Sequence, residues 1–115
     1  MSYKVTKANE SYVYTANGHY DCQTTRLHDP QDVNDGKLVC GLTHFLPGGG
    51  IEKKSNPAES IYYVLEGEMT VYIGDETYVL QKGDSIHFGG GVERECKNTS
   101  IATTQMLVCI LPAGN

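Results

Sequence analysis

The sequence has no run of about 18 apolar residues, so it offers no candidate for a transmembrane helix. Its first residues, MSYKVTKANESYVY, lack the apolar core of a secretory signal peptide, and the cytoplasm is therefore the expected location. Basic residues are also few, because nine Lys and Arg against 14 Asp and Glu give a formal net charge of -5. A surface of that sign argues against binding to a nucleic-acid backbone. We expect neither a membrane nor nucleic acid as a partner, whereas a small anion in a local positive pocket stays compatible with this composition.

Motifs built on paired cysteines or on phosphate-binding loops are absent as well. None of the four cysteines forms a CxxC pair, and without a secretory signal a disulfide framework has little support. Cys40 and Cys109 lie inside the apolar runs LVCGL and MLVCIL, which is typical of small core residues. No helical pattern follows the GGG runs at 48–50 and 89–91, so these glycines indicate hairpins rather than phosphate loops.

What the sequence does contain is a series of short strand patterns separated by turns. With 115 residues, 13 glycines and eight tyrosines, we expect one turn-rich β domain spanning 1–115. Residues 1–36 are expected to supply N-terminal strands and a loop, and residues 37–111 a barrel. Evenly spaced short strands with glycine turns favour an antiparallel sandwich or barrel. The expected strands are Tyr3–Thr6, Tyr12–Tyr14, Lys37–Leu46, Ser60–Leu65, Glu68–Ile73, Thr77–Leu80, Ser85–Phe88, Glu93–Asn98 and Thr103–Leu111, with a break at 47–50.

Alternation along two of these strands predicts which side chains point inward. In the segment 93–98, three charged residues share one face, so Arg94 and Cys96 on the other face are expected to point into the barrel. In the segment 38–46, His44 shares a face with the apolar residues Leu38, Leu42 and Leu46. We therefore expect His44 on an inward face.

The stretch from Gly48 to Asn98 resembles the two conserved motifs of the cupin family. The first motif is written G(X)5HXH(X)3,4E(X)6G, and here the span from Gly48 to Gly67 reads GGGIEKKSNPAESIYYVLEG. The second is written G(X)5PXG(X)2H(X)3N, and Gly83, Gly91 and Asn98 take its glycines and its asparagine. The resemblance implies an all-β double-stranded β-helix, the jelly-roll barrel of the cupins. It also implies a homodimer, because small cupin barrels commonly pair through N-terminal strands.

The metal ligands of the cupin motifs are replaced in this chain. The two histidines of the first motif fall on Lys54 and Asn56, the glutamate on Ser60, and the late histidine on Arg94. Lys and Arg carry no lone pair for a metal at neutral pH, and Asn and Ser are weak ligands. We expect no metal and no other cofactor at this position. Glu59 lies one residue from the glutamate position, and a shift of one residue turns a strand side chain to the other face.

Two inward cations near one another predict an anion site. Lys54 and Arg94 are expected to clamp a carboxylate or phosphate, with Asn56 and Ser60 adding neutral hydrogen bonds. His44 is the catalytic candidate, since histidine titrates near neutral pH without help. Two further residues are expected at the pocket rim, Tyr62 and Cys96. The main hypothesis is a metal-independent cupin that binds a small anionic metabolite, with isomerase, lyase or decarboxylase activity as the associated chemistries.

Alternatives stay open at the level of the sequence. Lys54 on a solvent-facing loop and Arg94 paired with Glu52 or Glu59 would leave no anion site. A histidine on an apolar strand face is also a common core residue, and the same pocket without a poised acid or base would make a non-catalytic binding module. A metalloenzyme of the dioxygenase type would need relocated ligands, for which His44, His87, Glu59 and Cys96 have the right chemistry. His19 and His28 lie in the polar N-terminal segment and are interpreted as surface residues.

Overall fold

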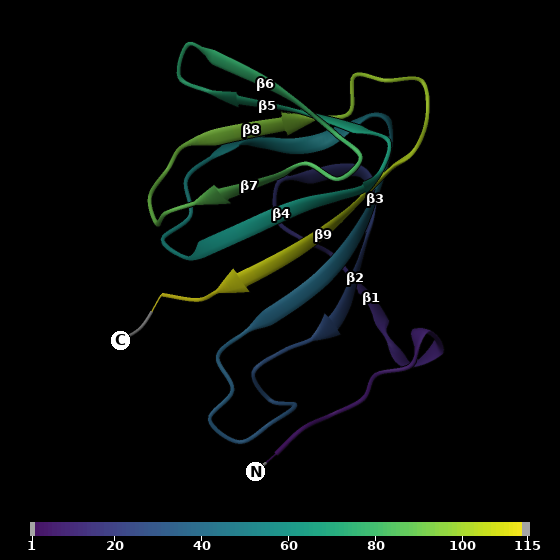
Figure 1. Ribbon diagram of the computed structural model, residues 1–115, viewed down its shortest axis with the longest axis vertical. Coiled ribbons are helices and arrows are strands. Elements are labelled where there is room, and N and C mark those ends of the chain that lie inside the picture. The colour runs from purple at the N-terminus through teal and green to yellow at the C-terminus, as the bar shows by residue number, and fades with distance from the viewer. Residues whose placement is uncertain (1, 114–115) are drawn as a thin grey trace.

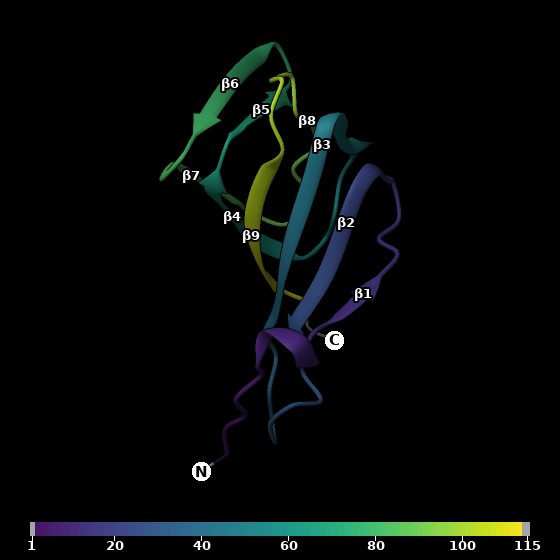
Figure 2. The ribbon, with the colours of Figure 1, turned by 90° about the vertical axis from the view of Figure 1, so that its right-hand side faces the viewer.

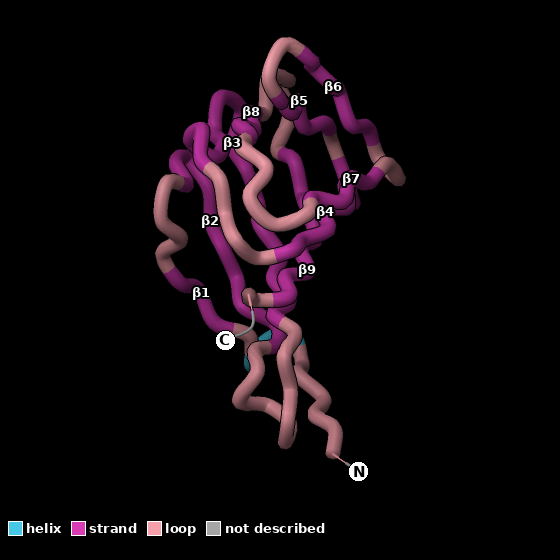
Figure 3. Tube along the Cα trace, turned by 90° about the vertical axis from the view of Figure 1, so that its left-hand side faces the viewer, coloured by secondary structure: helices cyan, strands magenta, loops and turns pink. Residues whose placement is uncertain are grey.

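Strands make up most of the chain over residues 2–113, which are the residues that the computed structural model describes. The only helical piece within that range is a single short 3-10 helix, and Figure 3 shows the strands in magenta. No helix in this range is long and apolar enough to span a membrane. The elements are η1 (Ala8–Glu10), β1 (Tyr12–Tyr14), β2 (His19–His28), β3 (Val39–Lys54), β4 (Glu59–Glu66), β5 (Glu68–Ile73), β6 (Glu76–Gln81), β7 (Ser85–Phe88), β8 (Arg94–Lys97) and β9 (Thr104–Leu111).

All paired strands run antiparallel, and they follow the order β6-β5-β8-β3-β9-β4-β7. β2 also pairs with β3, and β1 pairs with β2 at the edge of the sheet, as Figure 2 shows side by side. The sheet folds over on itself, so β5, β6 and β8 lie above β4, β7 and β9 in Figure 1. The result is a nearly closed antiparallel jelly-roll barrel, and the predicted all-β fold class is confirmed.

The long strand β3 belongs to both halves of the barrel. Its first part, Val39–Phe45, pairs with β9, and its last part, from Gly50 to Lys54, pairs with β8. Between them the chain passes so close to its neighbours that a Cβ on Gly49 would clash with the Asp21 carbonyl oxygen, and one on Gly50 with that of Cys96. The predicted break at 47–50 is therefore wrong, because the glycines bend a continuous strand instead of ending it.

Asn98 holds this bend in place. Its side chain is fully buried, and its Nδ2 donates hydrogen bonds to the carbonyl oxygens of Phe45 (3.0 Å) and Ala102 (2.8 Å). Its backbone N–H donates to Gly49 O, and its carbonyl accepts from Gly48 N–H, both at 2.8 Å. The final asparagine of the second cupin motif thus ties the bend in β3 to the loop before β9.

Of the two predictions made from alternation, the structure confirms one and contradicts the other. Arg94 and Cys96 are buried while Glu93 and Lys97 are exposed, so the inward face predicted for 93–98 is confirmed. The prediction that His44 faces inward is wrong. Its neighbours Thr43 and Phe45 are 4% and 0% exposed, whereas His44 lies on the opposite, outer face with Leu46, which is 55% exposed.

The reason is that the outer face of this part of the sheet is itself apolar. Leu38 is 65% exposed and Leu111 40%, and Cys40 and Cys109, which face each other across β3 and β9, are only half-buried. Apolar alternation therefore marked the outside of the barrel here. The predicted core position of these two cysteines is wrong for the same reason.

The N-terminal third differs from its prediction in two places. The strand expected at Tyr3–Thr6 is wrong, because these residues are irregular, while the one at Tyr12–Tyr14 is confirmed as β1. The ten-residue strand β2 was not predicted, since its sequence is polar and carries no clear alternation. β2 and β1 nevertheless extend the same sheet as β3 and line one side of the barrel.

We predict that Asn98→Ala lowers the free energy of unfolding by about 2–4 kcal/mol, because the buried carbonyl oxygen of Phe45 loses its side-chain donor and that of Ala102 loses one of two. Urea denaturation followed by circular dichroism measures this loss. Asn9→Ala, at an exposed position in η1, is the matched control and is expected to change stability by less than about 0.5 kcal/mol. Equal stability of the two variants would contradict the role given to Asn98.

Candidate functional site

A cavity of about 180 Å³ lies on the inner face of the barrel, beneath the turn between β1 and β2. Its lining comes from β1, β2, β3, β4, β8 and β9, so residues far apart in the sequence meet there. It is smaller than the roughly 300–1,000 Å³ of pockets for drug-sized ligands, which restricts it to small metabolites. Five of the residues singled out from the sequence line it, namely Lys54, Asn56, Ser60, Tyr62 and Arg94.

Arg94 is the buried centre of this site, with only 4% of its surface exposed. Its guanidinium lies 4.4 Å from the centroid of the Phe88 ring and donates to Tyr62 Oη at 3.1 Å and to the Val92 carbonyl at 3.1 Å. A longer contact of 3.5 Å reaches Ser60 Oγ. All of these partners are neutral, so the protein solvates the charge of Arg94 without neutralising it.

Lys54 ends β3 beside Arg94 and is half-buried. Its Nζ donates to the carbonyl oxygen of Asn17 at 2.9 Å. Burial, and after it the charge of Arg94, lowers the pKa of Lys54 from its usual value. The alternative of a solvent-facing lysine on a loop is wrong, because Lys54 belongs to the strand and lines the cavity.

A third cation, Arg26 of β2, also lines the cavity. Its guanidinium stacks at 4.3 Å over the ring of Tyr14, and its Nε is buried with no hydrogen-bond partner among residues 2–113. Such a donor costs free energy unless something accepts its hydrogen.

The lining contains no carboxylate. Within residues 2–113, no Asp or Glu lies within 4.0 Å of the charged nitrogens of Arg26, Lys54 or Arg94. The alternative that pairs Arg94 with Glu52 or Glu59 is therefore wrong. A protein of net charge -5 encloses a cavity that is locally positive.

Two sequence-predicted residues lie outside this cavity. His44 is on the outer face, where its Nδ1 is buried without a partner, and it does not contact the other site residues. Cys96 is fully packed in the core, and burial raises the pKa of its thiol to about 12. Neither residue is in a position to act on a ligand bound beside Arg94.

Sequence reasoning missed three residues that the fold brings to the cavity: Tyr14, His19 and Arg26. The surface interpretation of His19 is wrong, because its ring is half-buried and stacks on Phe45, with centroids 6.4 Å apart. His28 lies at the far end of β2, where its Nδ1 is 3.2 Å from Asp32. The available signal was the Asn17-Gly18 turn, which predicts a hairpin that folds the N-terminal segment back onto the barrel.

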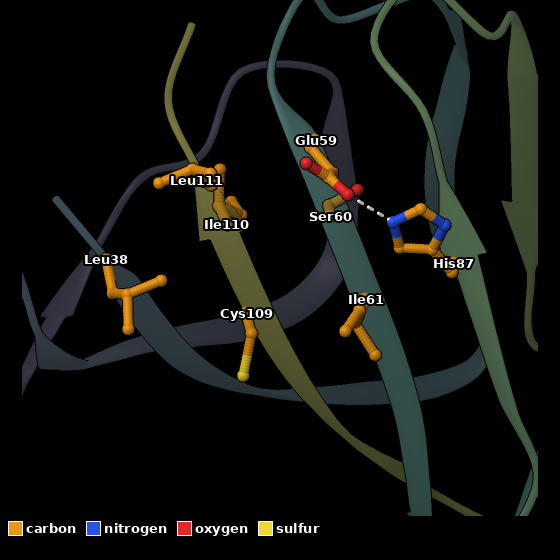
Figure 4. Close-up of a pocket in the computed structure, with 8 residues that line it drawn as sticks. All are labelled: Leu38, Glu59, Ser60, Ile61, His87, Cys109, Ile110 and Leu111. Atoms are coloured by element: carbon orange, nitrogen blue, oxygen red, sulfur yellow. Dashed lines mark hydrogen bonds and ion pairs between the residues drawn. The ribbon is translucent and has the colours of Figure 1, made fainter. Parts of the chain in front are cut away.

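A second pocket, of about 220 Å³, lies on the outer face of the sheet, and Figure 4 shows its lining. Leu38, Ile61, Cys109 and Leu111 give it an apolar wall. At its rim His87 Nε2 lies 2.5 Å from Glu59 Oε2, with both side chains about half exposed. Glu59 thus points away from the inner cavity, as the one-residue shift in register predicts.

 

The residues at the cupin ligand positions do not fit a divalent metal ion. Arg94 fills the centre of the site with a cation that cannot deprotonate at any pH the protein meets. Lys54 is a second cation at these positions, with no carboxylate within 4.0 Å of its Nζ among residues 2–113. Asn56 is occupied as well, since its Oδ1 accepts from Ala58 N–H at 2.9 Å. Divalent transition metals need imidazole, thiolate or carboxylate ligands, and this set offers none.

The relocated metal site considered from the sequence does not assemble. Of His44, His87, Glu59 and Cys96, only His87 and Glu59 are in contact. No group of three or more His, Cys, Asp or Glu side chains that could hold a metal occurs in the described part of the chain.

Comparisons with known proteins agree with this architecture. A family model described as a cupin domain matches residues 41–110. A protein of Mycobacterium tuberculosis named β-D-galactosidase is 30% identical over 107 residues, which cover 93% of this chain and 92% of that protein. The polyketide cyclase RemF from Streptomyces resistomycificus superposes with a TM-score of 0.80 at 20% identity, covering 96% of this chain and 80% of that one. A predicted oxalate decarboxylase from Thermotoga maritima gives a TM-score of 0.80 at 18% identity, with coverages of 96% and 100%.

We predict that protein purified without a histidine tag, after growth with added iron, manganese, nickel and zinc, carries far less than one equivalent of any of them, because the ligand positions hold cations and neutral groups. Plasma mass spectrometry measures this content. Close to one equivalent of a single transition metal would contradict our interpretation of the site.

Proposed function

Because the chain belongs to the cupin superfamily, we propose that its barrel cavity is a metal-independent site for a small anionic metabolite. Arg94 and Lys54 bind the anion, Ser60, Tyr62 and Asn56 orient it, and Arg26 completes the positive wall. The observation that supports this most directly is a 4% exposed arginine with only neutral partners.

The energetics of burial favour an anionic ligand. A buried charge costs several kcal/mol unless an opposite charge compensates it, and the described residues provide no such charge to Arg94. The guanidinium matches a carboxylate or phosphate with two parallel hydrogen bonds, and Lys54 adds a point charge. The same anion would raise the lowered pKa of Lys54, because it favours the ammonium form.

The associated chemistry is isomerisation, elimination or decarboxylation of that anion, and the competing proposal is a binding module without catalysis. The relatives do not select among these, since their names span a galactosidase, a polyketide cyclase and a predicted oxalate decarboxylase. A metal-dependent dioxygenase is disfavoured by the ligand set described above. The free thiols of all four cysteines suit the cytoplasm, which we keep as the proposed location.

Galactoside hydrolysis, the activity named for the Mycobacterium relative, is the other function to test. Glycosidases generally use two carboxyl groups on either side of the scissile bond, and the cavity is lined by none. Glu59 is beside a histidine but lies on the outer face. If the wild type hydrolyses nitrophenyl β-D-galactoside and Glu59→Gln does not, the active site lies at the outer pocket and not in the inner cavity.

The expected homodimer stays a proposal, but we assign it to the apolar outer face of β3, β4 and β9 in place of the N-terminal strands that the family resemblance implies. Ile61 and Tyr63 are 46% and 40% exposed there, and Leu38 and Leu111 extend the patch. Its charged pair, His87 and Glu59, is already matched within one chain. A twofold axis places this face against itself, so a second copy covers it without leaving a charge unpaired.

We predict that Arg94→Met abolishes stabilisation by small anions while leaving the ligand-free melting temperature within about 5 °C of wild type, because an uncompensated buried charge stabilises the fold little. Thermal shift with oxalate, malonate, pyruvate and inorganic phosphate measures both effects. An anion at 100 times its Kd adds about 2.7 kcal/mol to the wild type.

The control for this experiment is Lys97→Met, which removes an exposed cation from the outer face of the same strand. It is expected to keep the full response to anions. An anion response in Arg94→Met equal to that of the wild type, or no response of the wild type to any of the four anions, would contradict the proposed site.

We predict that Ile61→Lys converts the dimer to a monomer in sedimentation velocity, because it places a charge in the apolar face. Tyr78→Lys on β6 is the matched control, since Tyr78 and Ile61 are both 46% exposed, and it is expected to stay dimeric. A monomeric wild type, or an Ile61→Lys dimer of unchanged affinity, would rule out this interface.

A further inference from the structure

We propose that His19 is the general base of the cationic cavity, moving a proton at a carbon next to the carboxylate or ketone of a bound 2-oxo acid or similar small acid. This assignment rests on the proposed anion site and replaces His44 as the acid-base residue. It gives the cavity a reaction class, namely isomerisation through an enolate.

His19 is held rigidly at the edge of the cavity. It is the first residue of β2 and pairs with Ile51 of β3, so its backbone is part of the sheet. Its ring stacks on Phe45 at an interplanar angle of 18° and lines the same cavity as Lys54 and Arg94. A base needs this kind of fixed orientation to meet a substrate in reactive geometry.

The hydrogen bond of the ring selects its tautomer. His19 Nδ1 lies 3.1 Å from the carbonyl oxygen of Asn17, and a carbonyl oxygen only accepts hydrogen bonds. Nδ1 therefore carries the proton, and Nε2 keeps the lone pair. Within the described residues the ring makes no other hydrogen bond, which leaves Nε2 as a free base.

The same carbonyl oxygen also accepts from Lys54 Nζ at 2.9 Å, so one backbone atom positions both the base and a cation of the anion site. The turn that carries it is anchored, because Glu52 N–H donates to Gly18 O at 2.8 Å. Gly18 has a φ of 74°, a conformation in which a side chain would be strained.

The surroundings keep the imidazole neutral. Burial, which outweighs the hydrogen bond to Asn17, lowers the pKa of His19, and the charge of Lys54 lowers it further. The other charged or titratable residues that line the cavity are Arg26, Arg94, Tyr14 and Tyr62, and no carboxylate among the described residues lines it. Glu52, beside Gly18, and the buried Cys96 act on Lys54 from outside the lining. His19 is therefore deprotonated near neutral pH, as a general base requires.

The proposed step balances without a co-reactant. The carboxylate of the substrate lies against Arg94, and Nε2 of His19 takes a proton from the carbon beside the ketone. The electron pair of the broken C–H bond moves into the carbonyl group to form an enolate, whose oxygen Lys54 stabilises. The imidazolium then returns the proton to the enolate oxygen, which gives the enol isomer, or to the same carbon, which regenerates the substrate with its proton exchanged. Either return restores the neutral base.

The test uses pyruvate, which is small enough for the cavity and has exchangeable methyl protons. Wild-type protein in D2O is expected to speed loss of the methyl proton NMR signal by at least about 100-fold over buffer, the usual contribution of a general base. His19→Gln and His19→Phe are expected to lose this exchange while keeping the thermal shift by pyruvate. His19→Phe retains a ring against Phe45, which guards against a loss caused by unfolding.

His44→Gln is the matched control, because it changes a histidine on the outer face. This variant is expected to exchange the methyl protons of pyruvate as fast as the wild type. Exchange lost in His44→Gln, or kept in both His19 variants, would overturn the assignment. If the wild type binds pyruvate but does not exchange its methyl protons, the role of His19 is overturned and the proposed anion site is not. No binding of pyruvate or of any other anion would overturn the proposed function as well.

A second readout follows the ring of His19 directly, by NMR titration with and without malonate. A bound anion favours the imidazolium, so malonate is expected to raise the pKa of His19 and to bind more tightly as the pH falls through this range. Identical titration curves with and without malonate would place the ring of His19 out of reach of the bound anion, and that result would also overturn the assignment.

Discussion

The bend of β3 is the constraint on which the barrel depends. One strand serves both halves of the barrel because three backbones approach closely at Gly49 and Gly50, where no side chain fits. Asn98 supplies the hydrogen bonds that this irregular segment cannot obtain from the regular pairing. Buried backbone groups must be paired, so the fully buried amide of Asn98 stabilises the bend that joins the two halves. The cavity forms between those halves, and its shape therefore depends on a residue that does not line it.

The cavity is locally positive although the protein carries a net negative charge. Three cations face it without a carboxylate partner, and neutral groups around Arg94 replace only part of its hydration. Such an arrangement is energetically unfavourable in the ligand-free protein, and binding of the anion that we propose would relieve that cost. In the metal-binding members that the motifs describe, ligands occupy these positions. Here the same backbone positions carry the charge that a metal would otherwise supply.

Much of the fold could be predicted from the sequence, because glycine turns and motif spacing report directly on backbone geometry. The inward position of Arg94 was also predictable, since three charged residues marked the other face of its strand. His44 was misplaced because apolar alternation does not distinguish the core from an apolar outer face. His19 was missed for a different reason. Its place in the cavity depends on long-range pairing of a polar strand, and local sequence carries little information about such pairing.

The carbonyl oxygen of Asn17 has a consequence for how this site can change. Because it accepts from both His19 and Lys54, any displacement of the turn shifts both groups together. In the site that we propose, anion affinity and proton transfer are thereby coupled through one backbone atom, and a substitution that reshapes the turn to admit a larger molecule also disturbs the ring of His19. Adaptation of this barrel to new substrates is accordingly expected to proceed from the opposite wall, on β4 and β8, where side chains can be exchanged one at a time.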